Sequence, residues 1–590
     1  MLYPAVILVA LVSSARGVDK IAVVNSWPGG FQGSFCVHAN HAYHGWKALV
    51  IFSSAVENIE TNGADILSLN TDKTEYVLRG KERDPNIARG QCVTVNFTAT
   101  IAHGSTPTGT VTWLDKFDST AKETLEVTQS QGKDAPADAT PHGHGSTHEK
   151  YDYGDVLGKS ILFYEAQRSG KLPPNNRVSW RGDSALKDGS DVGHDLTGGW
   201  YDAGDFVKFG LPMASTTTLL LWSLIQWPDA YKAAKQLDHM YDCVKWPLDY
   251  FIKCHTGPNE FYVQVGDGYI DHDYWGRPEQ MTMKRPSFKV DAHHPGSDVA
   301  GETAAAMAAG YIAFKQRDSH YAGTLLAHAR QLYKFATTYK GKYSTSVPKV
   351  VEFYESDGYI DELTWAGAWL YKATGEQKYL DEAQANYRLG ASGPAWALDW
   401  DSKEAGAQLL LYEITKDTAY KNDITHFLRN WMPGGNVPYT PKGLAYRDKW
   451  GPNAYAANAA LVALMAAENG LNVDKYRAWA EKQINYILGD AGHSFVVGFG
   501  NNPPVRPHHA ASSCPNRPAN CDWDSFDSHG PNPQILFGAV VGGPDKHDVY
   551  KDDRKDYVKN EVACDYNSGF QASVAGLKHL ALIGELPREY

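Results

Sequence analysis

The spacing of apolar residues changes once along the chain, and this change limits the possible folds more than any other feature. From residue 18 to about residue 113, apolar and polar residues alternate in short runs such as CVTVNFTATI, separated by Gly, Asn, Asp and Pro. This alternation is typical of strands in an antiparallel sandwich. After residue 151 the period becomes 3.6, which is typical of helices. The sequence therefore predicts a small β-sandwich followed by a larger all-α domain.

The helical pattern recurs about twelve times over the remaining chain. The expected helices begin near Tyr151, Pro212, Tyr231, Ser297, His320, Gly358, Glu376, Lys403, Asp417, Asn453, Val473 and Ser568. Long loops between them carry aromatic and charged residues, as in VGDGYIDHDYWGRPEQM. A rigid scaffold with such loops is typical of a protein that binds its ligand in a cleft.

The domain boundaries follow from composition. Residues 1–17 contain a short apolar run followed by small residues, which predicts a signal peptide and a secreted protein. Residues 18–115 form the predicted sandwich, and residues 150–590 form the helical domain. Residues 116–149 are polar and rich in Pro and Gly, which predicts a flexible linker. His142, His144 and His148 in this segment could bind a metal weakly, but a solvated linker is the preferred explanation.

Charge and composition narrow the choice of partner. The net charge of -12 argues against nucleic acid, which needs a basic surface. The chain contains no run of about 18 apolar residues, so no membrane span is predicted. The chain has 17 Trp and 34 Tyr, several of them in Gly- and Pro-rich loops, which favours a substrate that stacks on aromatic rings.

The seven cysteines fit an oxidising compartment. Cys36 and Cys92 are expected to pair, and so are Cys514 and Cys521, which bracket the short loop CPNRPANC. The other three, Cys243, Cys254 and Cys564, are expected to be free and buried.

The segment TGGWYDAGDFVKFGLP places Asp202 and Asp205 among glycines and aromatic residues. Such residues often only shape a turn, because Asp bonds to nearby backbone groups and Gly tolerates positive φ. Alternatively, the two carboxylates act on a sugar, since aromatic rings stack on sugars and carboxylates hydrolyse glycosidic bonds. The segment alone leaves both interpretations open.

A second acidic segment, NEVACDYNSGF, lies near the C-terminus. Glu561 has apolar neighbours there, and a carboxyl in apolar surroundings has a raised pKa that suits a general acid. A Glu at the start of a helix also commonly complements the helix dipole. This segment alone favours the structural explanation.

Taken together, several segments resemble one family. The segment from Tyr550 to Ser568 is similar to the C-terminal signature of glycoside hydrolase family 9, the inverting endo-β-1,4-glucanases. WYDAGDFVKFG is similar to the catalytic loop of that family, and NNPPVRPHH is similar to its histidine segment. The resemblance covers residues 151–590 and implies an (α/α)6 barrel. The architecture as a whole resembles the digestive cellulases of invertebrates.

The resemblance also implies roles for individual residues. Asp205 corresponds to the general base that activates the attacking water, Asp202 to a neighbour that helps to hold it, and Glu561 to the general acid. The implied substrate-binding residues are Tyr201, His272, Trp275, Trp450, Arg506, His508 and Tyr566. Seen alone, Trp275 or Trp450 is better explained as a residue that packs the barrel.

The chain departs from the family pattern at two positions. Ala510 follows His508 and His509 where the family commonly has Arg, and Ala454 stands where it often has another Arg. The loss of both cations is expected to weaken sugar binding at particular subsites. The reaction type is not affected, because the three carboxylates are present.

The segment DGYIDEL resembles positions at which family members often hold a structural Ca²⁺. The implied ligands are Asp357, Gly358, Asp361, Glu362 and Asp401, and oxygen ligands of this kind suit Ca²⁺. An acidic helix N-terminus without a metal is the alternative. No cofactor is expected to take part in catalysis.

The N-terminal domain resembles a family 2 carbohydrate-binding module, with NSWPGGFQGSF and HGWKALVIF as the similar segments. Trp27 corresponds to an exposed binding tryptophan, and Trp46 to a core tryptophan. Two further surface tryptophans of such modules are missing, so weak binding to crystalline cellulose is expected.

The sequence thus predicts a secreted, monomeric endo-β-1,4-glucanase that acts on cellulose or related β-1,4-glucans. The alternative is a non-catalytic β-glucan-binding protein. A pure binder gains nothing from buried ionisable groups, whose desolvation is unfavourable, so the three carboxylates favour the enzyme.

Overall fold

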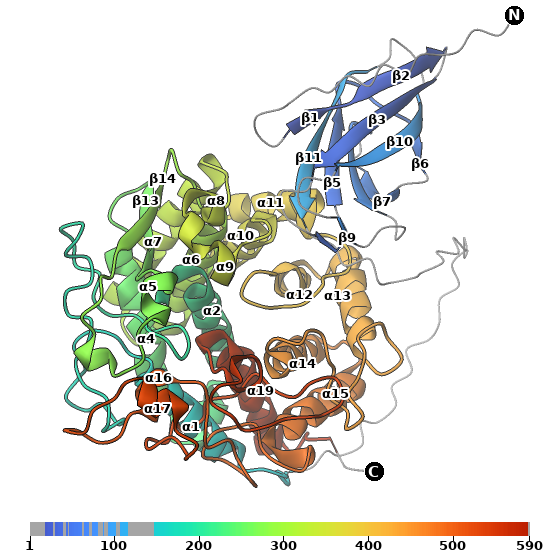
Figure 1. Cartoon of the computed structure of the whole chain (residues 1–590). Coiled ribbons are helices and arrows are strands. Elements are labelled where there is room, and N and C mark those ends of the chain that lie inside the picture. Colours follow the sequence, from blue (N-terminus) through green and yellow to red (C-terminus); the bar gives the residue numbers. More distant parts are fainter. Residues whose placement is uncertain are drawn as a thin grey trace, which may run out of the picture. The chain divides into compact units, whose positions relative to one another are not determined.

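The computed structural model describes residues 18–27, 30–38, 43–44, 47–61, 64–69, 73–80, 86–87, 92–101, 107–115 and 147–587. The chain divides into two compact units, one built from the N-terminal strands and one from the helices (Figure 1). The predicted signal peptide and nearly all of the predicted linker lie outside the described residues.

The N-terminal unit contains two antiparallel sheets. One has the order β1-β11-β5-β8-β7 and the other has the order β2-β3-β10-β6. Their bounds are β1 Val18–Lys20, β2 Ala22–Trp27, β3 Gly30–His38, β5 Lys47–Phe52, β6 Asn58–Thr61, β7 Ala64–Leu69, β8 Glu75–Gly80, β10 Cys92–Thr100 and β11 Gly109–Asp115. A third, two-residue pair joins β4 Tyr43–His44 to β9 Asn86–Ile87.

Alternation explains the core of this unit, because every second residue of a strand points to the same face. Phe31, Phe52 and Phe97 are buried, and their rings meet edge to face with centroids 5.9 to 6.1 Å apart. Val50 and Leu78 are also buried. Trp27 ends β2, but its side chain and the whole of Trp46 lie outside the described part of the chain, so their roles stay predictions.

Twelve long helices form two concentric rings in the second unit. The inner helices are α2 Gly210–Gln226, α6 Ser297–Phe314, α10 Ile360–Thr374, α12 Glu404–Thr415, α14 Pro452–Glu468 and α19 Cys564–Ile583. Each packs against the next, and α19 packs against α2, so the ring is closed. The (α/α)6 barrel implied by the family resemblance is therefore confirmed, as are the twelve expected helices.

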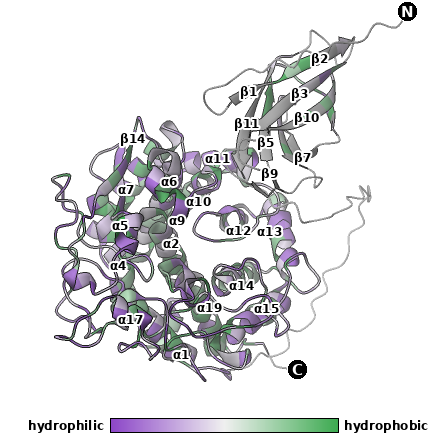
Figure 2. Ribbon diagram, viewed as in Figure 1, coloured by the Kyte–Doolittle hydropathy of each residue, from purple (hydrophilic) through white to green (hydrophobic). Residues whose placement is uncertain are grey.

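The outer helices each pack against an inner one. They are α1 Tyr153–Ala166, α4 Leu237–Cys254, α7 Ser319–Thr338, α11 Gln377–Asn386, α13 Thr418–Trp431 and α15 Val473–Asn485. Inner helices are buried almost all round, whereas outer helices bury one face only. Figure 2 shows the corresponding hydrophilic residues on outer helices such as α13 and α15.

The short elements lie mainly in the loops. They are α3 Pro228–Ala233, α5 Gly268–His272, α8 Tyr343–Ser346, α9 Val351–Tyr354, α16 Ala510–Ser513, α17 Trp523–Asp527, α18 Tyr557–Asn560, β12 Lys208–Phe209, β13 Glu260–Val265 and β14 Ser287–Asp291. The last three form a small antiparallel sheet. No described helix combines the length and hydrophobicity that crossing a membrane requires.

The cysteine predictions for this unit are confirmed. Cys514 and Cys521 form a disulfide, and Cys243, Cys254 and Cys564 are free and buried. The side chains of Cys36 and Cys92 lie outside the described part of the chain, so their pairing remains a prediction.

Candidate active site

A cavity of about 600 Å³ lies where the inner helices begin. The acidic residues that line it are Asp202, Asp205, Asp271, Glu352, Asp399, Glu561 and Asp565. Most of these precede or open an inner helix: residues 202–209 lead into α2, residue 399 into α12, and residues 561–565 into α19. The positive ends of several helix dipoles therefore face the cavity, where they stabilise negative charge.

Close backbone contacts explain why glycine stands in the segment that carries the two aspartates. A side chain on Gly204 would place its Cβ 2.2 Å from the carbonyl oxygen of His508. The Gly204 carbonyl in turn accepts a hydrogen bond from the Ala510 N–H at 2.9 Å. Asp202 and Asp205 are therefore held on a loop that fits tightly against the histidine segment, rather than in a free turn.

Asp205 is the more accessible of these two aspartates. Its side chain is 15% exposed, and its Oδ2 lies 3.6 Å from His272 Nε2. The interaction with the Asp205 carboxylate raises the pKa of His272. A carboxylate that faces the cavity beside an imidazole can take a proton from a bound water.

Asp202 is buried, and the Tyr354 hydroxyl donates a hydrogen bond to its Oδ2. Burial, followed by the negative charges of Asp565 and Asp205, raises the pKa of Asp202 well above its usual range. A carboxyl that tends to stay protonated is a poor base but a good hydrogen-bonding group. Asp202 therefore suits a holding role and Asp205 the role of base.

Glu561 lines the same cavity as these aspartates and lies beside His508, with which it forms a parallel β-bridge. The Trp450 indole N–H and the Tyr566 hydroxyl both donate to its Oε2, at 2.6 and 2.8 Å. Burial raises the pKa of Glu561, and these two hydrogen bonds oppose that shift. Because Oε2 already accepts two bonds, Oε1 is the oxygen that carries the proton of the acid form.

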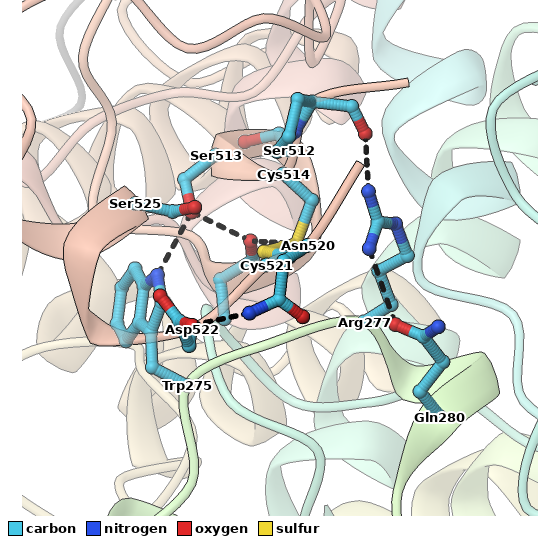
Figure 3. Close-up of a disulfide and its surroundings, with 12 residues drawn as sticks. Trp275, Arg277, Gln280, Ser512, Ser513, Cys514, Asn520, Cys521, Asp522 and Ser525 are labelled. Carbon is cyan, nitrogen blue, oxygen red and sulfur yellow. Dashed lines mark hydrogen bonds between the residues drawn. A yellow bond between two sulfur atoms is a disulfide. The ribbon is translucent and has the colours of Figure 1, made fainter. Parts of the chain in front are cut away.

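Besides His508, four of the predicted substrate-binding residues line the cavity: His272, Trp275, Trp450 and Tyr566. Trp450 is 42% exposed, which leaves a ring face for a ligand. Trp275 is fixed by a hydrogen bond from its indole N–H to the Ser513 hydroxyl, next to the disulfide (Figure 3).

His508 lies at the centre of an aromatic group in the same cavity. Its ring lies 5.2 Å from Trp275 and 6.1 Å from Phe526 and Tyr557. Its Nδ1 donates to the Arg554 carbonyl at 2.7 Å, since a carbonyl can only accept. Burial lowers the pKa of His508, so Nε2 remains a hydrogen-bond acceptor.

Two predicted substrate contacts lie elsewhere. Tyr201 is 1% exposed and packs against Phe206, while its hydroxyl donates to Ser184 at 2.8 Å. The Arg506 side chain donates to the His529 carbonyl at 3.0 Å, outside the group of residues that line the cavity. These side chains support the loops around the cavity, and direct contact of either residue with a substrate stays a prediction.

Sequence reasoning missed several lining residues, among them Tyr354, Trp400, Trp523 and Asp565. Tyr354 lies 152 positions from Asp202, so no local spacing connects them. Trp523 is 45% exposed and follows the disulfide loop. The excess of aromatic residues in loops was the available signal for the three aromatic residues, and the acidic segment NEVACDYNSGF was the signal for Asp565.

The expected calcium ligands are near one another but are partly engaged. Asp401 accepts hydrogen bonds from the Asp357 N–H at 3.1 and 3.3 Å, and Asp361 accepts one from the Lys403 N–H at 2.6 Å. Among the described residues, no three His, Cys, Asp or Glu side chains form a ready metal site. Glu362, however, is fully buried and neither of its carboxylate oxygens has a hydrogen-bond partner.

Comparison with known proteins agrees with this geometry. Residues 153–574 match glycosyl hydrolase family 9. Endoglucanase A of Bacillus pumilus is 48% identical over 454 residues, which cover 74% of this chain and 67% of that protein.

Two solved structures extend the comparison. The endoglucanase of the termite Nasutitermes takasagoensis superposes with a TM-score of 0.72 at 55% identity, over 73% of this chain and 100% of that one. Endoglucanase CelQ of Clostridium thermocellum, complexed with cellotriose, has a TM-score of 0.66 at 38% identity, over 75% of this chain and 72% of that one. Because the family match spans well over half of the sequence and includes both acidic segments, the chain belongs to glycosyl hydrolase family 9.

Proposed function

We propose that the protein is an endo-β-1,4-glucanase that hydrolyses internal bonds of cellulose and related β-glucans with inversion. One observation carries the proposal: an accessible aspartate and a glutamate with a raised pKa line the same cavity, in a chain similar to several endoglucanases. Release of reducing sugar from carboxymethylcellulose tests it. No release at any pH would favour a non-catalytic β-glucan-binding protein.

In the proposed mechanism each acidic residue has one task. Asp205 takes a proton from a water that attacks the anomeric carbon, and Asp202 helps to hold that water. Glu561 gives its proton to the leaving oxygen. An inverting site needs about 6.5 to 9.5 Å between base and acid, because the water lies between the base and the sugar.

Exposed aromatic residues that line the cavity support a glucan as substrate. Trp450 and Tyr557, which contact each other, are 42% and 53% exposed, and Trp523 is 45% exposed beside Trp275. Rings of this kind stack on pyranose faces. The solved CelQ complex with cellotriose indicates the class of ligand.

The two missing arginines bear on this substrate-binding surface. Ala510 and Ala454 both line the cavity. Arginines at these two positions would lie beside a bound substrate. Without them, we expect weaker hydrogen bonding to the sugar at particular subsites.

A structural Ca²⁺ at the start of α10 is part of the proposal. Burial, followed by the charge of Asp361, raises the pKa of Glu362 well above its usual range. Lys403 is a nearby cation, but besides Asp361 and Glu362 it faces Glu302 and Asp399. The carboxyl groups around this lysine therefore outnumber its single positive charge. Asp361, Glu362, Asp401 and the Gly358 carbonyl, with Asp357, would hold the ion. Calcium would supply charge compensation and no catalytic step.

If calcium binds there, excess chelator is expected to lower the melting temperature. A ligand that binds only the folded state stabilises it, by about 2.7 kcal/mol when its free concentration is 100 times Kd. Activity at moderate temperature should fall less than stability. The Glu362→Gln variant should lose its response to chelator, as followed by differential scanning calorimetry. An unchanged melting temperature of the wild type in chelator would leave the acidic helix N-terminus as the explanation.

We also infer that the protein is secreted and monomeric, and that its N-terminal unit is a family 2 carbohydrate-binding module. The leader-like segment supports secretion, and Trp27 in its NSWPGGFQGSF segment supports the module. The similarity to a termite endoglucanase agrees with a digestive cellulase of the invertebrate type.

Deleting residues 18–115 is expected to leave kcat on soluble carboxymethylcellulose near that of the full chain. Binding to insoluble cellulose should fall modestly, because the one predicted binding ring of the module, Trp27, is lost. Trp27→Ala in the full chain should have the same effect in a pull-down with crystalline cellulose. Tight binding that survives Trp27→Ala would show that the binding face lies elsewhere on the module.

A further inference from the structure

One buried ion pair holds the backbone of Phe206, the residue after Asp205. The Phe206 N–H donates to Asp271 Oδ1 at 3.0 Å, and the Phe206 carbonyl accepts from Arg285 Nη1 at 2.8 Å. Asp271 Oδ2 and Arg285 Nη1 lie 3.6 Å apart. Because the N–H belongs to the peptide that joins Asp205 to Phe206, the pair restrains the backbone that carries the Asp205 side chain.

A second buried ion pair fixes the first. Arg285 contacts Asp188 through two hydrogen bonds, Nε to Oδ1 at 2.8 Å and Nη2 to Oδ2 at 3.1 Å. Asp188 also lies 2.8 Å from the Nζ of Lys208, which is inaccessible to solvent. Asp271, Arg285, Asp188 and Lys208 therefore form one network of two carboxylates and two cations. One end of it binds the Phe206 backbone, and the other end is the Lys208 side chain. Bidentate arginine contacts have a rigid geometry.

Asp271 also faces the catalytic groups. It lines the cavity and immediately precedes His272, whose Nε2 is 3.6 Å from Asp205 Oδ2. The charged groups around its carboxyl are Asp205, Arg285 and His272. Burial, followed by the charge of Asp205, raises the pKa of Asp271 to about 7. Its charge therefore changes near neutral pH, unlike that of a surface aspartate.

We propose that Asp271 and Arg285 are positioning residues that hold the Asp205–Phe206 peptide so that Asp205 is correctly oriented toward the attacking water. This inference rests on the proposed role of Asp205 as general base. Ionised Asp271 makes a charge-assisted hydrogen bond to the Phe206 N–H and attracts Arg285, whereas its protonated form binds both more weakly. The restraint on Asp205 therefore becomes stronger as the pH rises through about 7.

The test compares Asp271→Asn with Glu279→Gln in the full chain. Glu279 is also a buried carboxylate paired with an arginine, at 2.9 Å from Arg181 Nε, and it accepts from the Gly182 N–H at 2.8 Å. It supports residues 166–184 rather than the Asp205 loop. Both changes replace a carboxylate by its amide, so they disturb buried charge to a similar degree.

Asp271→Asn is expected to lower kcat on carboxymethylcellulose about 10- to 100-fold at pH 8, because a small misplacement of a catalytic group has effects of this size. KM should stay within about twofold. At pH 5 the loss should be much smaller, because protonated Asp271 and Asn are both neutral. Glu279→Gln should change kcat by one small factor at both pH values. The protonation state of Glu561 also changes activity with pH, but it does so in the wild type and the variants alike. Its effect therefore cancels in the ratio of variant to wild-type kcat at each pH.

Arg285→Lys gives an independent measurement and decides the question if Asp271→Asn does not fold. Lysine keeps the charge but cannot bind both Asp188 oxygens and the Phe206 carbonyl together, so kcat should again fall at constant KM. A normal kcat in this variant would overturn the inference. The inference would also be overturned if the loss of kcat in Asp271→Asn were independent of pH, or if it were equal to the loss in Glu279→Gln. If Asp205→Asn keeps the wild-type kcat, Asp205 is not the general base on which this inference rests. Failure of the proposed function is a different result, namely no release of reducing sugar by the wild type.

Discussion

Replacing Glu561 by Gln is expected to lower kcat on cellulosic substrates by about 10²- to 10⁴-fold, the usual contribution of a general acid. The amide keeps the hydrogen-bonding shape, and Trp450 and Tyr566 remain as neighbours. What is lost is the proton on Oε1, which the glucosyl leaving group needs. Aryl cellobiosides with good leaving groups should be cleaved at nearly the wild-type rate, because such leaving groups depart with little proton assistance. Parallel steady-state measurements on the two kinds of substrate check this.

Glu352→Gln is the matched control, because Glu352 also lines the cavity but has no role in the proposed mechanism. It should leave both activities within a few-fold of the wild type. An equal loss of both activities in Glu561→Gln would contradict the assignment of Glu561 as the acid. The raised pKa of Glu561 agrees with an acid that keeps its proton above the usual range of a carboxyl.

Asp205→Ala is the second change with a large expected effect, a loss of about 10²- to 10⁴-fold in kcat. Sodium azide should restore part of the activity if it enters the space left by the carboxylate and attacks the anomeric carbon from the side of the water. Asp202→Ala should be milder, because Asp202 is buried against Tyr354 and helps to hold the water rather than accepting its proton. Equal losses in the two variants would contradict this division of roles.

The same mechanism determines the stereochemistry of the product. With the water between Asp205 and the sugar, a single displacement yields the α-anomer first, which proton NMR detects before mutarotation. A β-anomer as first product would overturn the inverting mechanism. So would a base-to-acid separation near 5 Å in a substrate complex, which is typical of retaining enzymes.

Much of this protein was readable from the sequence because the information is local. The change of period near residue 150 predicted the sandwich and all twelve helices, since the spacing of apolar residues follows the repeat of a strand or a helix whatever that element packs against. The order Asp202, Asp205 and Glu561 in two recognisable segments was enough to predict the acidic centre. The Cys514–Cys521 disulfide was also predictable, because only a short loop separates its cysteines.

The tertiary structure alone decided which side chains face the cavity. Tyr201 and Trp275 are both aromatic residues in cavity-forming loops, yet Tyr201 is part of the loop packing and Trp275 lines the cavity. The contact of Tyr354 with Asp202 and the hold of Asp271 and Arg285 on Phe206 connect segments that are 65 to 152 positions apart. Such contacts form only when the inner helices close into a ring and bring their N-terminal loops together. Periodicity shows which face of a helix is apolar, but it contains no information about which distant loop will meet its end.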